Sequence, residues 1–419
     1  MREISFVKKV RAKGGKVYVT GGWVRDYQRG AVPKDKDYVI TGLKAGEFQA
    51  LFPEAKCVGI SFPVFLLSIE DQTVEVALAR RERKQGTGYR GFWVQAEGDV
   101  TIEEDLFRRD TTINSMAVEL PEERLIDPYG GQRDIENRVI RAVSPHFSED
   151  PVRALRAARQ AAEFGFTVAS ETISYMASCR KELVREPGER IFGELKRALL
   201  SPQPSIFFRV LQNADLLAPI FPELHALIGK TQPVVYHPEG DAFEHTMAII
   251  DGVAQETTNP ITRFAALAHD LGKGTTPKEM VPHHYGHEER GLHILEAWGK
   301  RLPFPRLWLS TARFVVAEHM RAPRLEKPGK IVKLLLALSH LPIGATEFSI
   351  IIKNDHKGLP EYLAHADDYL RLIQSVHGGD APAGLTGKAV GAWIFAKQIS
   401  LYKNASRKAI LSDGKSGFA

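Results

Sequence analysis

Hydrophobic and polar residues alternate along several short segments of the first 140 residues, as they do in half-buried β-strands. Strand patterns occupy residues 16–22, 37–41, 73–79 and 115–120, and a helical pattern occupies residues 44–52. The glycines that end the first strand pattern are followed by a short helical pattern that closes at Gly30. This part of the chain is therefore predicted to mix helices with a sheet.

From residue 148 onward the pattern becomes almost entirely helical. Apolar residues recur at helical spacing through 148–166, 188–201 and 205–224. Asp150 is expected to cap the first of these helices, with Pro151 at its first position. A connector rich in proline and glycine at 229–241 is expected to separate a further helical region, which holds most of the 14 histidines. We expect boundaries near residues 140, 228 and 375.

Composition narrows the class of protein without identifying it. The chain has 419 residues, of which 43% are hydrophobic and 26% are charged, values typical of a soluble protein with several domains. We find no apolar run long enough to span a membrane and no signal-peptide pattern, so we expect a cytoplasmic protein without a membrane partner. Two cysteines, Cys57 and Cys179, cannot form a disulfide framework. A net charge of +5 permits an anionic partner.

The segment "GGWVRDYQRGAVPKDKDYVI" at residues 21–40 suggests a phosphate site. A strand that ends in two glycines and turns into a helix lets backbone N–H groups approach an anion. Arg25 lies one turn into that helix, where its guanidinium can reach a phosphate. A Gly-Gly turn alone is weak evidence for such a site.

Carboxylates follow directly in the same segment. Asp35 and Asp37 are two residues apart, so both side chains are expected on one face of a strand. Carboxylate oxygens suit Mg²⁺, and two such ions can clamp the attacking and leaving oxygens of a phosphoryl displacement. Glu75 is a candidate third carboxylate, because Val74 and Val76 point to the other side of its strand. The segment therefore predicts a phosphoryl-transfer site.

Several motifs together resemble a known enzyme family. They are "GGWVRD…DKD", "RRDTTINSMA" (108–117), "IDPYGGQRDIENRVIRAV" (126–143) and "EDPVRALRAAR" (149–159). Their order and spacing are similar to those of the class II tRNA nucleotidyltransferases, the CCA-adding enzymes of the polymerase-β superfamily. The histidine-rich region resembles the HD domain of the bacterial multifunctional form. Bacterial poly(A) polymerase shares the head motifs and remains the alternative.

The resemblance implies an α+β fold with a polymerase-β-like head at 1–140, a helical neck and body at 141–228, an HD domain at 229–375 and a helical tail at 376–419. It implies addition of CTP and ATP to the 3′ end of tRNA with Mg²⁺. In that family the Asp35 and Asp37 positions bind the metals, and Gly22, Arg25 and Arg109 hold the triphosphate. Asp110 would support the sugar of the nucleotide or the geometry of the motif itself. The chain would be a monomer or a homodimer.

The helix at 148–166 presents an arginine every three residues, which places a basic stripe opposite an apolar one. The resemblance assigns base selection to Asp150 and Arg153 and further nucleotide contacts to Arg156 and Arg159. A carboxylate and a guanidinium can pair with the amino group and ring acceptor shared by cytosine and adenine, and would reject uracil and guanine. The alternative is a capped helix with a surface arginine stripe.

The histidine-rich region supplies His245, His269, Asp270 and Asp355, which match the H…HD…D pattern of HD phosphohydrolases. Imidazoles and carboxylates at this spacing suit a divalent metal, Ni²⁺ or Mg²⁺, that activates a water. Lys273 could meet a phosphate. Further candidate ligands are His283, His284 and His287. The alternative is an HD fold that is purely structural.

Two competing functions stay open at this point. Poly(A) polymerases lack an HD domain and usually end in a long basic tail, neither of which fits this chain. A non-catalytic RNA-binding protein on a polymerase scaffold is disfavoured by the intact Asp35 and Asp37. The basic, glycine-rich loop at 83–92, with Tyr89 and the glycines 86, 88 and 91, is expected to move near the cleft or to be an inert surface loop.

Overall fold

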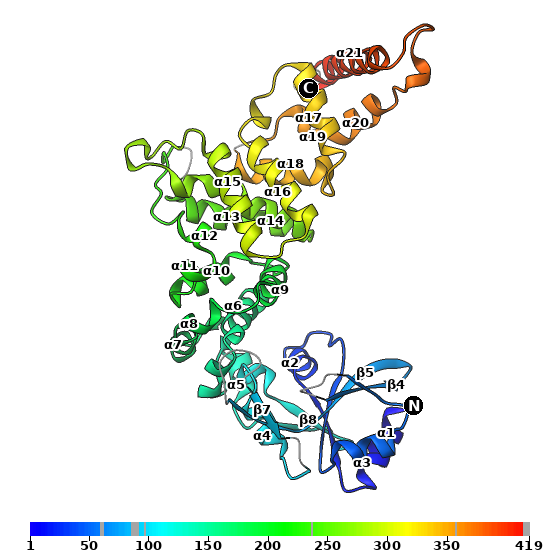
Figure 1. Ribbon diagram of the computed structural model, residues 1–419, viewed down its shortest axis with the longest axis vertical. Helices are drawn as coiled ribbons and strands as arrows, with labels where there is room; N and C mark the ends of the chain where they lie inside the picture. The colour runs from blue at the N-terminus through cyan, green and yellow to red at the C-terminus, as the bar shows by residue number, and fades with distance from the viewer. Residues whose placement is uncertain (59–62, 85–91, 96–97, 236–237, 357, 414–419) are drawn as a thin grey trace. The chain divides into compact units, whose positions relative to one another are not determined.

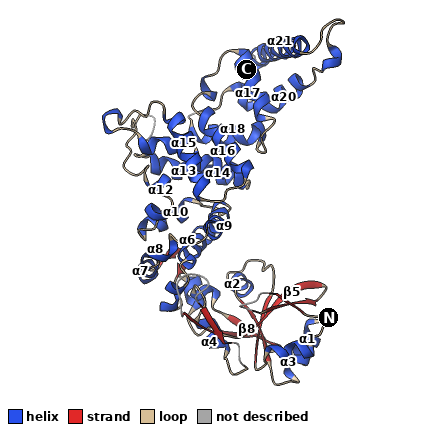
Figure 2. Ribbon diagram, in the orientation of Figure 1, coloured by secondary structure: helices blue, strands red, loops and turns tan. Residues whose placement is uncertain are grey.

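The computed structural model describes residues 1–58, 63–84, 92–95, 98–235, 238–356 and 358–413 (Figure 1). The chain forms two compact units. The first contains Met1–Ser201 and Ile206–Ile220, and the second contains Pro202–Ser205 and Phe221–Ala419. All described strands belong to the first unit, whereas the second is helical (Figure 2). The glycine-rich loop around Tyr89 lies outside the described residues, so its expected mobility stays a prediction.

A seven-stranded mixed sheet forms the centre of the first unit, with strand order β3-β4-β5-β2-β1-β8-β9. Strands β2 and β5 run parallel, while the other neighbours are antiparallel. The strands are β1 (Lys16–Thr20), β2 (Asp37–Thr41), β3 (Lys56–Val58), β4 (Val64–Ile69), β5 (Gln72–Leu78), β8 (Ala117–Leu120) and β9 (Arg124–Ile126). Two small sheets pair β6 (Arg81–Lys84) with β7 (Phe92–Gln95), and β10 (Val139–Ile140) with β11 (Thr167–Val168).

Each face of the central sheet carries its own core, because successive side chains of a strand point to opposite faces. Helices α1 (Glu3–Arg11) and α3 (Ala45–Leu51) bury aromatic residues such as Phe6 and Phe48 against one face. Helix α4 (Ile102–Phe107) packs Leu106 against Tyr18 and Val39 on the other. That second face leads to the polar residues of the predicted site.

Helices make up the rest of the first unit. They are α2 (Gly22–Gln28), α5 (Gly131–Glu136), α6 (Val152–Phe164), α7 (Ser170–Ser178), α8 (Arg180–Leu183), α9 (Gly188–Leu199), α10 (Ser205–Asn213) and α11 (Leu217–Ile220). Helix α6 buries its apolar stripe as expected, with Leu155, Ala158 and Ala162 at most 1% exposed. Its start differs from the expectation: the helix begins at Val152, so Pro151 occupies the cap position. Asp150 still accepts a hydrogen bond from the Val152 N–H at 3.3 Å.

The second unit is built from α12 (Pro222–His225), α13 (Ala242–Glu256), α14 (Pro260–Ala268), α15 (His287–Arg301), α16 (Arg306–Glu318), α17 (Pro328–Leu338), α18 (Gly344–Asp355), α19 (Glu361–Ala364), α20 (Ala366–Gln374) and α21 (Lys388–Asp413). Its core includes an aromatic cluster in which Phe264 packs against Trp298, Phe304 and Trp308. Among the described helices, none has both the length and the apolar character needed to cross a membrane.

The connector at 229–241 packs onto the second unit. Thr231 and Asp241 form an antiparallel bridge, and the Ala242 N–H donates to the Lys230 carbonyl at 3.0 Å. The Asp241 side chain caps α13 and also accepts from the Gly229 N–H at 2.7 Å. The connector is thus a folded loop of the second unit. The division of the chain into four parts stays a prediction.

Candidate functional site

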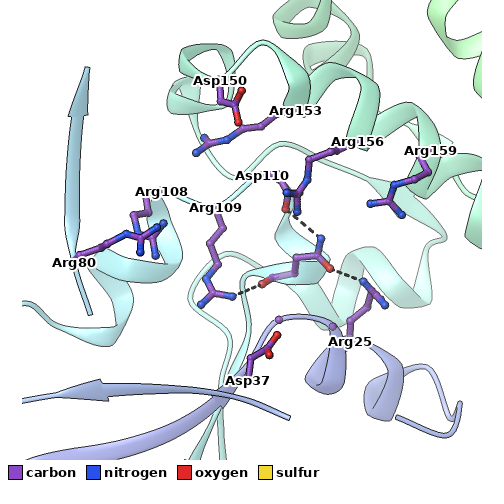
Figure 3. Close-up of a pocket in the computed structure, with 13 residues that line it drawn as sticks. Arg25, Asp37, Arg80, Arg108, Arg109, Asp110, Asp150, Arg153, Arg156 and Arg159 are labelled. Atoms are coloured by element: carbon purple, nitrogen blue, oxygen red, sulfur yellow. Dashed lines mark hydrogen bonds and ion pairs between the residues drawn. The ribbon is translucent and has the colours of Figure 1, made fainter. Parts of the chain in front are cut away.

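A polar cleft of about 510 Å³ lies where the second face of the sheet meets helix α6 (Figure 3). We call it the head cleft. Seven arginines line it together with three aspartates, two glycines and one asparagine: Gly21, Gly22, Arg25, Asp37, Arg80, Arg108, Arg109, Asp110, Asn114, Asp150, Arg153, Arg156 and Arg159. This excess of guanidinium groups makes the cleft suited to a polyanion such as a nucleoside triphosphate.

Asp37 and Glu75 lie side by side at one edge of the head cleft. The register of β2 and β5 pairs Tyr38 with Val76. Asp37 and Glu75 each precede one of these residues, so they lie opposite each other on the same face of the sheet. Glu75 is exposed between the buried Val74 and Val76, as the alternation predicted.

Asp35 lies two residues before Asp37, outside the strand, because β2 begins at Asp37. The expectation that both aspartates sit on one strand was therefore wrong. Burial is the main cause that raises the pKa of Asp37, and the carboxylates of Glu75 and Asp35 add to the rise. The guanidinium of Arg109 opposes it. Glu75 and Asp35 are thus both close enough to Asp37 to repel its negative charge, which a divalent cation would relieve.

The turn between β1 and α2 brings backbone to the cleft floor. Gly21 has φ +73°, and a Cβ there would lie 3.3 Å from Nη1 of Arg109, so a side chain would crowd the cleft. Arg25 makes paired hydrogen bonds to Asp26 at 2.9 Å and donates from Nη1 to Oδ1 of Asn114 at 2.9 Å. These contacts fix the guanidinium at the wall of the cleft.

Asp105 and Asn114, which the sequence analysis did not identify, hold the arginines of the "RRD" motif. Asp105 is fully buried and contacts Arg108 at 2.7 Å and Arg109 at 3.1 Å. Burial alone would raise the pKa of Asp105, but these two guanidinium groups lower it to about 2. Arg109 also donates to the hydroxyl of Thr20 at 3.1 Å. Its position is therefore set by a neighbour four residues earlier and by Thr20 of β1, which is distant in sequence.

Asp110 is a buried junction between the sheet and helix α6. It accepts hydrogen bonds from Asn114 at 3.1 Å, from Nε of Arg156 at 2.8 Å and from Gln160 at 3.2 Å. Burial opposes ionisation, but Arg156 and Asn114 outweigh it and hold the pKa of Asp110 well below its ordinary value. Asp110 thus fixes Arg156 at the cleft wall.

The predicted base-selecting residues, Asp150 and Arg153, both line the cleft but have separate partners. Both oxygens of Asp150 lie 3.0 Å from Nη2 of Arg190, on helix α9. Arg153 donates to the His146 carbonyl at 2.8 Å. Arg159 is bonded to Glu194 at 2.6 Å and to Glu163 at 2.5 Å. No motif in the sequence distinguishes Arg190, which is one of several basic residues in an amphipathic helix.

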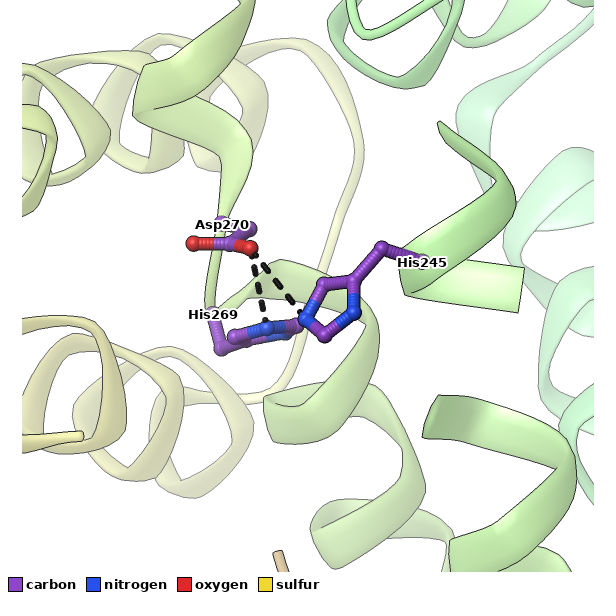
Figure 4. A group of neighbouring side chains, drawn as sticks. All are labelled: His245, His269 and Asp270. Carbon is purple, nitrogen blue, oxygen red and sulfur yellow. Dashed lines mark ion pairs between the residues drawn. The ribbon is translucent and has the colours of Figure 1, made fainter. Parts of the chain in front are cut away.

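A second group of ionisable residues lies in the second unit, at the ends of helices α13, α14, α15, α16 and α18. We call it the histidine–aspartate cluster, and Figure 4 shows three of its members. Its members are buried and comprise His245, His269, Asp270, His287, His319 and Asp355.

Two sets of three ligand atoms share Asp270, and each could hold a metal ion: His245, His269 and Asp270 form one set, and Asp270, His287 and His319 the other. Nε2 of His269 lies 3.2 Å from Oδ2 of Asp270, and Nε2 of His287 lies 3.2 Å from Oδ1. Asp355 lies 3.0 Å from Nε2 of His245. His319, which comes from the end of α16, was missed because no recognisable motif surrounds it.

Unsatisfied polar atoms support metal binding in this cluster. Among the described residues, Nε2 of His269, both carboxylate oxygens of Asp270 and Oδ2 of Asp355 are buried without a hydrogen bond of good geometry, although Oδ2 of Asp270 is ion-paired with Lys273 at 2.5 Å. Buried groups of this kind normally have a partner, so an ion is expected among them. Burial opposes protonation of His269, but Asp270 and Asp355 outweigh it and raise its pKa to about 10. The cluster therefore attracts positive charge.

The other predicted residues of this region have different surroundings. Lys273 lies 2.5 Å from Oδ2 of Asp270 and donates to Gln232 at 2.6 Å. His284 contacts Thr276 and a backbone carbonyl, and burial lowers its pKa. His283 is exposed and stacks on Tyr285. Neither His283 nor His284 belongs to the two ligand sets.

Known proteins resemble the chain over nearly all of its length. Residues 17–141 match the family described as "Poly A polymerase head domain", residues 165–228 match "Probable RNA and SrmB- binding site of polymerase A", and residues 243–341 match "HD domain". The multifunctional CCA protein of Nitrosococcus oceani is 46% identical over 324 residues, covering 76% of this chain and 78% of that one. That of Thioalkalivibrio sulfidiphilus is 40% identical over 405 residues, covering 93% and 98%.

Solved structures confirm the fold. A CCA-adding enzyme in its apo form II has a TM-score of 0.66 at 22% identity and covers 94% of this chain and 90% of its own. The complex of a CCA-adding enzyme with ATP has a TM-score of 0.63 at 20% identity, covering 95% and 88%. The predicted polymerase-β-like head with a helical body and an HD domain is confirmed.

Proposed function

The chain belongs to the family of multifunctional CCA proteins, and on that premise we propose that the head cleft adds the terminal CCA sequence to tRNA from CTP and ATP. The chain is a nucleotidyltransferase with an HD domain. The observation that carries the proposal is the arginine-lined cleft with Asp37 and Glu75 paired at its edge. We place the reaction in the cytoplasm.

The residues of the head cleft divide the work of nucleotidyl transfer. We assign the triphosphate to Arg25, Arg109 and the turn at Gly22, where guanidinium and backbone N–H groups converge. We assign the metal, Mg²⁺, to Asp35, Asp37 and Glu75, because the repulsion that the other two carboxylates exert on Asp37 fits a divalent cation. When bound, the metal would stabilise charge on the attacking and leaving oxygens.

Selection of the base is assigned to Asp150 and Arg153. Arg190 orients the carboxylate of Asp150, so one of its lone pairs can accept from the amino group of cytosine or adenine. Arg153 can donate to the adjacent ring acceptor. Uracil and guanine present a keto oxygen to Asp150, so one hydrogen-bond acceptor faces another, which disfavours their binding. Arg156 and Arg159 complete the basic wall.

The test uses purified protein and tRNA that ends at the discriminator base, with each labelled nucleoside triphosphate supplied in turn. We expect two cytidylates and then one adenylate to be added in the presence of Mg²⁺, with no addition of UMP or GMP. Processive addition of adenylate alone would favour poly(A) polymerase. No incorporation of any nucleotide would favour the non-catalytic RNA-binding protein.

A second activity is proposed for the histidine–aspartate cluster, because its orphaned buried ligand atoms fit a divalent metal. We infer hydrolysis of phosphate esters such as 2′,3′-cyclic nucleotides, 2′-nucleotides and simple phosphates. His245, His269, Asp270 and Asp355 would hold the ion, Ni²⁺ or Mg²⁺, with His287 and His319 completing the second ligand set. The ion would supply an activated water.

Lys273 carries a positive charge beside Asp270, where it could attract the phosphate of the substrate. Hydrolysis by the wild type with Mg²⁺, Mn²⁺, Ni²⁺ or Co²⁺, lost in His269→Ala, would support this activity. Its absence with all four ions would favour a structural HD fold.

A further inference from the structure

The connector at 229–241 contributes side chains to the histidine–aspartate cluster. Oε1 of Glu239 lies 2.5 Å from Nδ1 of His245. Gln232, on the same connector, accepts a hydrogen bond from Lys273 at 2.6 Å. A segment whose composition suggests a spacer thus touches one member of the cluster, His245, and Lys273 beside the cluster.

The partner of a histidine's second ring nitrogen decides which nitrogen can bind a metal. Nδ1 of His269, His287 and His319 lies 2.7, 2.9 and 3.0 Å from a backbone carbonyl oxygen. A carbonyl accepts a hydrogen bond, so each ring holds a proton on Nδ1 and turns Nε2 toward the cluster, where a metal would replace any proton on Nε2. Each carbonyl belongs to the residue three positions earlier in the chain, so these three rings are oriented locally.

His245 obtains the same orientation from a carboxylate. Its ring is 3% exposed, and its Nε2 atom lies 3.0 Å from Asp355 and 3.6 Å from Asp270. Glu288 lies 3.6 Å from Nδ1 of His287, beyond hydrogen-bond reach, so the close contact with a carboxylate distinguishes His245. An anionic acceptor also makes the imidazole a stronger electron donor to a metal.

We propose that Glu239 is a positioning residue that orients His245 and strengthens metal binding by the histidine–aspartate cluster. The inference rests on the metal site proposed above. The loop fixes Glu239 through the bridge between Thr231 and Asp241 and through the hydrogen bond from Gln232 N–H to the Gly240 carbonyl at 3.3 Å. Metal affinity therefore depends on the fold of the connector.

The test measures binding of Co²⁺ to metal-free full-length protein by its visible absorption and by calorimetry. All proteins carry Asp37→Ala, which removes a carboxylate ligand from the head cleft. We expect Glu239→Ala to weaken binding about 10- to 100-fold, the range for losing a group that orients a metal ligand. Glu239→Gln, which keeps a neutral acceptor, should lie between it and the wild type.

Glu279→Gln serves as the matched control, because Glu279 is an exposed carboxylate of the same unit. Its Co²⁺ affinity should be unchanged. Thermal unfolding of the metal-free proteins separates positioning from a structural role, since a positioning residue changes affinity and leaves the unfolding temperature nearly constant. Unchanged affinity in both Glu239 variants would overturn the inference.

His269→Ala distinguishes failure of the inference from failure of the site. If it abolishes Co²⁺ binding while the Glu239 variants bind like the wild type, the metal site stands and Glu239 has no positioning role. If His269→Ala binds Co²⁺ as tightly as the wild type, the metal site itself is refuted, and the role of Glu239 with it.

Discussion

Replacing Asp105 with asparagine tests whether a buried carboxylate organises the head cleft. Asp105→Asn keeps the shape of the side chain and removes the charge that Arg108 and Arg109 contact. The pKa of Asp105 falls from 3.8 to about 2, and at 1.36 kcal/mol per pH unit this difference corresponds to about 2 kcal/mol of stability. We expect the variant to lose a free energy of that order at pH 7.

The pH dependence of the stability follows from the lowered pKa of Asp105 in the folded protein. A carboxyl group with a lowered pKa in the folded state contributes its full stabilisation above about pH 4. The contribution is lost as the pH falls towards 2, where the folded protein also becomes protonated. The stability difference between the wild type and Asp105→Asn should therefore be constant from pH 7 to 5 and shrink below pH 4.

Hydrogen exchange in peptides from β1 and β2 measures this difference in the first unit alone. Kinetically, release of Arg109 should raise the KM for CTP and ATP together by about 10-fold, which corresponds to 1.4 kcal/mol. Glu103→Gln is the control, because Glu103 is exposed on the same helix. A variant with unchanged KM values and unchanged exchange would refute the role of Asp105. A stability difference that is as large at pH 2.5 as at pH 7 would show that charge is not the cause.

Three further outcomes test the assigned residues. Asp37→Ala should abolish addition of both CTP and ATP while tRNA binding is nearly retained, because a metal ligand serves the transfer step. A variant that kept a tenth of the wild-type rate at saturating Mg²⁺ would contradict the role of Asp37 as a metal ligand. Asp150→Ala or Arg153→Ala should reduce discrimination against UTP by about 1–3 kcal/mol, measured as the C/U ratio of kcat/KM, whereas equal slowing of all nucleotides would indicate a structural role. His269→Ala should leave CTP addition within a few-fold of wild type, and loss of addition would show that the two activities are coupled.

The sequence determined the elements and the residue types of both sites. Alternation of side chains identified the strand that carries Glu75, because Val74 and Val76 had to be buried on the other face. Helical spacing predicted that α6 buries Leu155 and Ala158 and leaves its arginines at the cleft. Patterns of this kind depend only on the period of a helix or strand, so they can be recognised without the fold.

The tertiary structure decided which distant side chains hold the functional ones. Asp110 fixes Arg156 and Arg190 fixes Asp150 from elements distant in sequence, while Glu239 reaches His245 from the connector. Each contact is specified by how the elements pack rather than by local spacing. A lone aspartate, arginine or glutamate has the same sequence signature at the surface and in a site, so only packing brings these groups within hydrogen-bonding distance of the residues they hold.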